Sequence, residues 1–166
     1  VLIAVMDGME AVYHGPKGLN YIADQIHFKT NALLRALKNL GYDLVEEPVF
    51  DTVKINLPES ENGNLMRFMV NRGINLKYFT EGTVSIALNE STTLEKLDFL
   101  VESFANFKQK QSSKLIIKEE YTIPAELLRK DEILTEEVFN KYHTETELMR
   151  YIKRLERKDL SLTHSM

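Results

Sequence analysis

The segment INLKYFTEGTVSIAL, residues 74–88, contains two short β-rich runs separated by Thr80-Glu81-Gly82. Glycine supplies the positive φ that tight turns need, so the segment predicts a β-hairpin. A third run, DTVKINL at residues 51–57, alternates apolar and polar side chains and predicts a strand with one buried face. We expect the buried face of the sheet to carry Val53, Ile55, Leu57, Val84, Ile86 and Leu88.

Helical patterns surround these strands. One helix is predicted from about residue 17 to residue 40, a second over residues 61–73, and a third over residues 91–107. In the third, Thr92 and Glu95 have the spacing of a capping box. The order helix, strand, helix, strand, strand, helix predicts an α/β (α+β) domain, in which helices cover one face of a three-stranded, mainly antiparallel sheet.

The first and last parts of the chain have a different character. VLIAVMDGM, residues 1–9, is mostly apolar, and we expect it to belong to a buried helix that starts before this chain. Residues 108–143 are polar with few apolar positions, which favours an extended connector lying on another surface. Thr144 and Glu147 then begin a capped helix, whose apolar face consists of Leu148, Tyr151, Ile152 and Leu155. Two apolar surfaces without a partner predict self-association of the chain.

Composition excludes several classes of function. The formal net charge of −4 gives no electrostatic footprint for nucleic acid or for an anionic membrane. No apolar run reaches the roughly 18 residues that a membrane-spanning helix needs. The absence of cysteine excludes disulfides, thiolate metal sites and a cysteine nucleophile. We therefore expect no nucleic-acid partner and no membrane partner.

The residues offer little that indicates chemistry. The four histidines are His14, His27, His143 and His164, and no two of them have the H-x-x-x-H spacing of a helical metal site. We expect His14 to stabilise a turn, His27 to be partly buried, and His143 to fix the turn before its helix. GPKG, residues 15–18, matches neither a P-loop nor a dinucleotide-binding fingerprint. The residues by themselves predict no catalytic, cofactor-binding or metal-binding group.

Three segments resemble the P-proteins of the glycine cleavage system, in the order in which that family has them. They are MDGMEAVYHGPKGL (residues 6–19), GINLKYFTEGTVSIALNESTT (73–93) and YHTETELMRYIKRLERKDLSLTHSM (142–166). Asp7 stands where the family usually has a small residue, and Glu10 stands where it usually has tyrosine. The matches extend over nearly the whole chain.

This resemblance implies a division of the chain. Each half of a P-protein has the type I fold of pyridoxal-phosphate enzymes, and this chain is similar to the small C-terminal domain of the first half with the linker into the second. Residues 1–40 would then be a helical segment from the large domain together with the interdomain helix. Residues 41–108 would be the small α/β domain, and residues 109–166 the linker and helix that lead to the catalytic half. That catalytic half is the partner that the resemblance implies.

The resemblance also implies an activity for the larger protein, that of a decarboxylating glycine dehydrogenase, an oxidoreductase. With pyridoxal phosphate, such an enzyme decarboxylates glycine and passes the aminomethyl group to the lipoyl arm of H-protein, in the bacterial cytoplasm or the eukaryotic mitochondrion. The family's cofactor lysine would lie beyond Met166, so we expect this chain to bind no cofactor and to be structural and inactive. His164 and Ser165 are the candidates for residues near the active site of the larger protein.

Two other hypotheses stay open at this point. The small domain of another type I pyridoxal-phosphate enzyme has the same order of helices and strands, although the capped helix after Thr144 is not typical of it. A non-enzymatic binding module with a plait fold is the second. Such a module would cover its own apolar surfaces, whereas residues 1–3 and the face of the last helix are predicted to lack a partner.

Overall fold

The computed structural model of the chain describes residues 1–45, 48–112, 114–160 and 162. Its contacts divide the chain into two units. The terminal unit consists of Val1–Ile22 and Arg129–Met166, and the sheet unit is Ala23–Leu128. Within the described ranges, no helix is both long enough and apolar enough to cross a membrane.

The sheet unit is built on four antiparallel strands in the order β1-β2-β4-β3. They are β1 (Asp43–Leu44), β2 (Thr52–Asn56), β3 (Lys77–Tyr78) and β4 (Thr83–Ala87). The predicted hairpin forms as β3 and β4, and the predicted alternating strand is β2. The prediction of three strands missed β1, because a strand of two residues shows no alternation and β1, unlike β3, is not followed by a glycine turn that indicates a hairpin.

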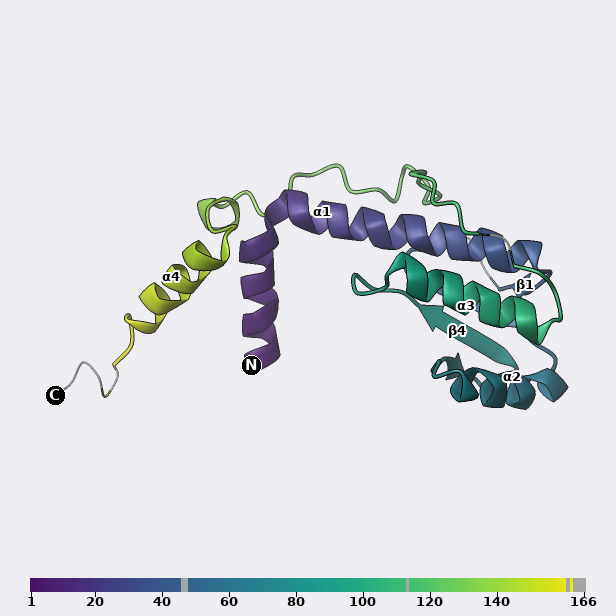
Figure 1. Ribbon diagram of the computed structural model, residues 1–166. Coiled ribbons are helices and arrows are strands. Elements are labelled where there is room, and N and C mark those ends of the chain that lie inside the picture. Colours follow the sequence, from purple (N-terminus) through teal and green to yellow (C-terminus); the bar gives the residue numbers. More distant parts are fainter. Residues whose placement is uncertain (46–47, 113, 161, 163–166) are drawn as a thin grey trace. The chain divides into compact units, whose positions relative to one another are not determined.

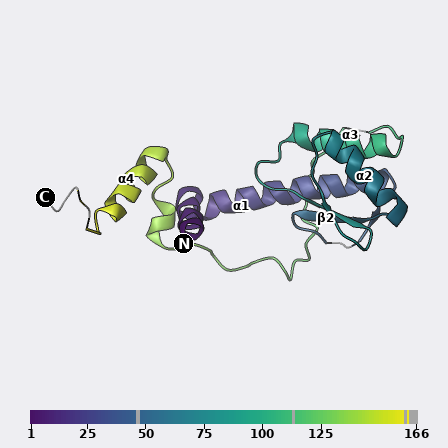
Figure 2. The ribbon, with the colours of Figure 1, turned by 90° about the horizontal axis from the view of Figure 1, so that it is seen from below.

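Helices cover one face of this sheet. They are α2 (Glu59–Asn71), α3 (Leu94–Phe107) and the part of α1 (Leu2–Asn39) that belongs to the sheet unit. Figure 1 labels α2 and α3, Figure 2 shows them next to each other, and these two helices are in contact. The predicted order of helices and strands is therefore confirmed, with β1 added.

The predicted buried face is also confirmed. The apolar side chains that alternate along β2 and β4, together with the residue after each strand, are buried. They are Val53, Ile55, Leu57, Val84, Ile86 and Leu88. The intervening Lys54 and Asn56 are exposed. The pairing of β2 with β4 places Val53 opposite Ile86, so the two strands present their apolar residues to the same helices.

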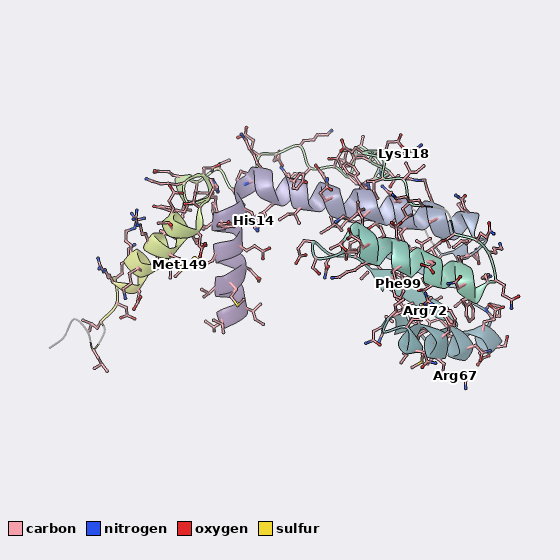
Figure 3. All side chains as sticks on the ribbon, viewed as in Figure 1. His14, Arg67, Arg72, Phe99, Lys118 and Met149 are labelled. Atoms are coloured by element: carbon pink, nitrogen blue, oxygen red, sulfur yellow. The ribbon has the colours of Figure 1, made fainter. Side chains whose placement is uncertain are left out.

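Arg72 joins α2 to α3. It is the C-cap residue of α2, and its Nε donates to the hydroxyl of Ser103 at 2.9 Å. The guanidinium group lies 4.9 Å from the centre of the Phe99 ring, and Figure 3 labels both residues where the two helices face each other. The planar guanidinium group of Arg72 thus packs against the Phe99 ring, while its Nε–H keeps a hydrogen bond to Ser103.

The predicted capping box of α3 is wrong by one residue. Thr93, not Thr92, is the N-cap, and its hydroxyl accepts the N–H of Lys96 at 3.3 Å. Thr92 instead exchanges hydrogen bonds with Asn89, which close a turn before the helix. Two consecutive threonines have the same capping ability, and the turn decides which of them caps.

The connector lies on the sheet unit, as predicted, over its first part. Leu115 and Ile117 pack against the core. Further along, the Tyr121 hydroxyl donates to the carboxylate of Asp24 on α1. These contacts supply the apolar surface that the connector cannot supply by itself.

Tyr42 ties the end of α1 to α3. Its hydroxyl donates to the carbonyl oxygen of Phe104 at 2.9 Å, and its ring meets the Phe104 ring edge to face. The side chain is 4% exposed. Burial, and after it the negative charge of Glu61, raises the pKa of Tyr42 well above its ordinary value. The folded protein therefore favours the neutral phenol.

This pKa shift predicts a loss of stability in alkali. In the unfolded chain the phenol ionises near pH 10, so the contribution of Tyr42 is complete below about pH 10 and is lost as the pH rises from there toward the higher folded pKa. Tyr42→Phe should lower the free energy of unfolding near pH 7 by about 1 kcal/mol, since the hydrogen bond to Phe104 is removed. The variant should also lose less stability than the unmodified chain between about pH 8 and about pH 10.5.

Urea unfolding followed by circular dichroism measures both effects. Tyr21→Phe is the matched control, because the Tyr21 side chain is exposed. An equal alkaline loss in the Tyr42→Phe variant and in the unmodified chain would show that Tyr42 is not responsible.

Candidate functional site

The terminal unit is organised around a kink in α1 at Gly15. This residue has φ 62° and ψ −176°, a non-helical conformation that interrupts the helix. Pro16 follows, and its fixed φ and missing N–H suit the first turn of the helical segment that begins there. The residues Gly15-Pro16 therefore stop one helical segment and start the next.

A segment from the C-terminal part of the sequence packs against the kink. A Cβ atom on Gly15 would lie 2.7 Å from the carbonyl oxygen of Phe139 and 2.7 Å from Cε1 of His143. Phe139 belongs to the short 3-10 helix η1 (Glu137–Asn140). Glycine is therefore needed at position 15 for two reasons. It tolerates the positive φ, and a side chain there would clash with Phe139 and His143.

His143 fastens this segment to α1. Its Nδ1 lies 2.8 Å from the carbonyl oxygen of Tyr13. A carbonyl oxygen can only accept, so Nδ1 carries the proton and donates it. The prediction that His143 fixes its own turn missed this partner, which lies 130 residues earlier in the chain.

Gly18 and His14 complete the junction on the α1 side. A Cβ atom on Gly18 would lie 2.9 Å from Cβ of His14, a separation that packed side chains do not reach. The His14 ring contacts the Tyr13 ring edge to face, and Figure 3 labels His14 next to the bend of α1. The two glycines of GPKG thus serve close packing.

The predicted cap of the last helix, α4 (Glu145–Glu156), is confirmed. The Thr144 hydroxyl accepts the N–H of Glu147, and the Glu147 carboxylate accepts the N–H of Thr144, each at 3.3 Å. Because both bonds satisfy donors that a helix start leaves open, α4 begins at a defined place, with its N-cap Thr144 directly after His143.

His27 forms a second polar cluster, in the sheet unit. It is 1% exposed, so its burial is complete and not partial as predicted. Its ring is stacked with the rings of Phe50 and Tyr121. Nε2 accepts the N–H of Thr122 at 3.2 Å and lies 3.0 Å from the amide nitrogen of Asn31, which places the proton of a neutral ring on Nδ1. Nδ1 has no hydrogen-bond partner among the described residues.

The structure brings together no catalytic constellation among the residues that it describes. His164 and Ser165, the candidates for residues near an active site, lie outside the described residues. Within the described part, no group of three or more histidines and carboxylates is placed to hold a metal ion. The clusters at Gly15 and at His27 both hold parts of the chain together through hydrogen bonds and close packing.

The fold is a small α+β domain with helices on one face of an antiparallel sheet. It also contains a kinked helix, against which a distant segment of the chain packs. The sequence profile described as Glycine cleavage system P-protein matches residues 1–104. The chain therefore belongs to the glycine cleavage system P-protein family, and the resemblance of its three segments is confirmed.

Relatives carry the same description over the whole chain. The chain is 46% identical to a "Glycine dehydrogenase (decarboxylating)" of Christiangramia forsetii, with 100% of the chain and 17% of the relative aligned. It is 42% identical to proteins of that name from Bacteroides fragilis, with 99% of the chain aligned, and from Nostoc sp., with 100% aligned; each alignment covers 18% of the relative. The chain thus spans about 17% of the length of the curated relatives it matches.

The described residues do not fit a covalent site for pyridoxal phosphate, the cofactor that the resemblance implies. Such a site needs a lysine in a closed pocket that lowers its pKa. Lys29 and Lys108 are half-buried, and the other lysines are exposed. Both of these have a structural partner, since Lys29 donates to the carbonyl oxygen of Thr92 at 2.7 Å and the Lys108 ammonium group lies 4.6 Å from the centre of the Tyr42 ring.

The geometry at the kink predicts the effect of a side chain at Gly15. Gly15→Ala should destabilise the junction by at least about 1 kcal/mol, because alanine is strained at positive φ and its Cβ meets Phe139 and His143. Gly8→Ala is the matched control in the same helix, since a Cβ atom there meets nothing within 4 Å. That control should stabilise the helix by up to about 1 kcal/mol.

Hydrogen exchange of the amides in residues 137–143 is the measurement. Faster exchange in the Gly15→Ala variant and unchanged exchange in the Gly8→Ala variant are expected. Equal protection in both variants would mean that the kink does not hold the segment.

Proposed function

We propose that this chain contributes structurally to a larger glycine-decarboxylating P-protein. The identity of 46% over the whole chain to a decarboxylating glycine dehydrogenase supports this function. The larger protein would decarboxylate glycine with pyridoxal phosphate and pass the aminomethyl group to the lipoyl arm of H-protein. The bacterial relatives favour the cytoplasm as its location. Membership of the family disfavours both another type I pyridoxal-phosphate enzyme and a free-standing binding module.

The chain's own role in this proposal is to hold the connector that leads to the catalytic half. The observation that carries it is the hydrogen bond from His143 to the Tyr13 carbonyl oxygen at the Gly15 kink. This contact fixes where α4 begins, because the capping box at Thr144 follows His143 directly. The division at residues 1–40, 41–108 and 109–166 into interdomain helix, small domain and linker belongs to the same proposal.

In this proposal the cofactor and glycine bind elsewhere in the larger protein. Pyridoxal phosphate supplies the electron-accepting ring when bound, and the protein has to bind and orient it. The lysines described here have solvent or structural partners, and none is buried. The contribution of this chain is therefore to position the connector and to bury apolar surface.

Cofactor binding by the 166-residue chain tests this role. The chain is mixed with pyridoxal phosphate, dialysed, reduced with borohydride and examined by mass spectrometry. We expect no cofactor absorbance after dialysis and no singly modified lysine. We also expect no exchange of the glycine carboxyl group with bicarbonate, with or without H-protein. Stoichiometric modification of one lysine would overturn the structural role and indicate a site of its own.

We also propose that the isolated chain self-associates. The side chains of Leu2 and Met6, one helical turn apart on α1, are exposed and apolar, as is that of Ile152 on α4. Exposed apolar side chains tend to find an apolar partner surface.

Sedimentation at increasing protein concentration measures this association. Leu2→Gln/Met6→Gln should shift the chain toward the monomer. Met66→Gln/Val70→Gln is the matched control, because these two residues have the same spacing on α2 and are also exposed. A chain that is monomeric at all concentrations would contradict the proposal.

A further inference from the structure

Three arginines form a row along α4. Arg150 and Arg154 belong to the helix and Arg157 is its C-cap; they are spaced four and three residues apart and therefore share one face. All three line one open pocket of about 530 Å³. The pocket is completed by Lys141, Tyr142, Glu147 and Lys153. The helix dipole favours cations in the last turn, which holds Lys153 and Arg154, but it does not account for Arg150 in the middle of the helix.

The central arginine of the row is held in place by two tyrosines. The rings of Tyr142 and Tyr151 are stacked, with centres 4.5 Å apart and planes 14° apart. The Arg154 guanidinium group lies 5.3 Å from the centre of the Tyr142 ring and 5.6 Å from that of Tyr151, and it donates to the Tyr142 hydroxyl at 2.6 Å. Arg154 is therefore oriented in advance, and most of its five N–H donors remain for another acceptor.

Within the chain, part of the positive charge of the pocket is compensated. Its carboxylate, Glu147, already accepts hydrogen bonds in the capping box. Of the cations, Lys141 pairs with Glu137 and Lys153 pairs with Glu156.

Arg150 and Arg157 have no side-chain hydrogen bond or ion pair within the part of the chain that the structure describes. The chain as a whole carries a net charge of −4, so this concentration of positive charge is of the opposite sign to the net charge of the chain.

We propose that this row binds an acidic segment of a partner protein, extended along α4. Guanidinium groups pair with carboxylates through two parallel hydrogen bonds, which gives both energy and orientation. From Arg150 to Arg157 the row extends about 10 Å along the helix, at about 1.5 Å per residue. Alternate side chains of an extended segment repeat every ~6.6 Å, so two or three successive carboxylates on one side of such a segment fit the row. A single small anion is too short to engage all of it.

The strength of this recognition comes from several arginines acting together. One exposed ion pair contributes little, but a row with an oriented central member loses less side-chain freedom on binding. The exposed position also makes the interaction sensitive to salt. These properties suit a partner that docks reversibly.

Fluorescence anisotropy with a short labelled peptide of alternating glutamate and alanine tests the proposal on the full 166-residue chain. We expect saturable binding that weakens with added salt, and none to the same peptide with glutamine in place of glutamate. Arg150→Gln/Arg157→Gln should weaken binding by about tenfold or more, as expected when two ion pairs are lost. Lys114→Gln/Lys118→Gln removes the same charge from exposed positions on the connector and should leave the affinity unchanged within about twofold.

Two further comparisons separate arginine recognition from charge alone. Arg150→Lys/Arg157→Lys keeps the charge, and circular dichroism should show the helix intact; weaker binding in this variant supports pairing through the guanidinium fork. Equal loss in the arginine and connector lysine variants would overturn the proposal, since general charge would explain it. Binding of pyrophosphate, measured by calorimetry, without any binding of the glutamate peptide would overturn it in favour of a small-anion site.

Discussion

The sheet unit depends on the register between β2 and β4. Ile55 lies opposite Val84 and Val53 opposite Ile86, so the apolar side chains of both strands point to the same side. Since the side-chain period of a strand is two, a shift of β2 by one residue would turn Val53 and Ile55 away from the helices and bury Lys54. The buried parts of α1, α2 and α3 all pack on this single apolar face, and their positions follow from it.

The turn chemistry supports this register. Gly82 adopts φ 81°, and a Cβ atom there would lie 2.8 Å from the carbonyl oxygen of Leu57. The N–H of Leu57 in turn donates to the carbonyl oxygen of Gly82 at 2.8 Å. A glycine that looks like an ordinary hairpin residue in the sequence therefore also lets the end of β2 approach the turn between β3 and β4.

The parts of the fold that could be predicted from the sequence are those set by local periodicity. Alternation along DTVKINL is enough to predict the buried positions of β2, and the capping box at Thr144 is a local pattern. β1 and the choice between Thr92 and Thr93 depend on neighbouring turns and pairings that leave no periodic signal. The full burial of His27 depends on Tyr121 and Thr122, which are more than 90 residues away.

The contact between Gly15 and the segment around His143 could not be predicted from the sequence either. The quoted segments around Gly15 and His143 each resemble the family, but no property of either segment indicates that the two meet. A glycine before proline predicts a helix boundary, and the sequence does give that. The second reason for the glycine, the carbonyl oxygen of Phe139, arises only when the distant segment is in place.

The electrostatics of the described residues agree with a structural role. Strongly shifted pKa values in a cleft are typical of catalytic groups, whereas here each shift has a structural cause. Burial raises the pKa of Tyr78, and the hydrogen bond to Asp24 raises that of Tyr121. The bond with Lys141 lowers the pKa of Glu137, which lies on the segment that rests at the kink. These three groups with shifted pKa values therefore lie at contacts of the connector and the core.

The arginine row along α4 differs from these groups because two of its charges, Arg150 and Arg157, have no such partner within the described chain.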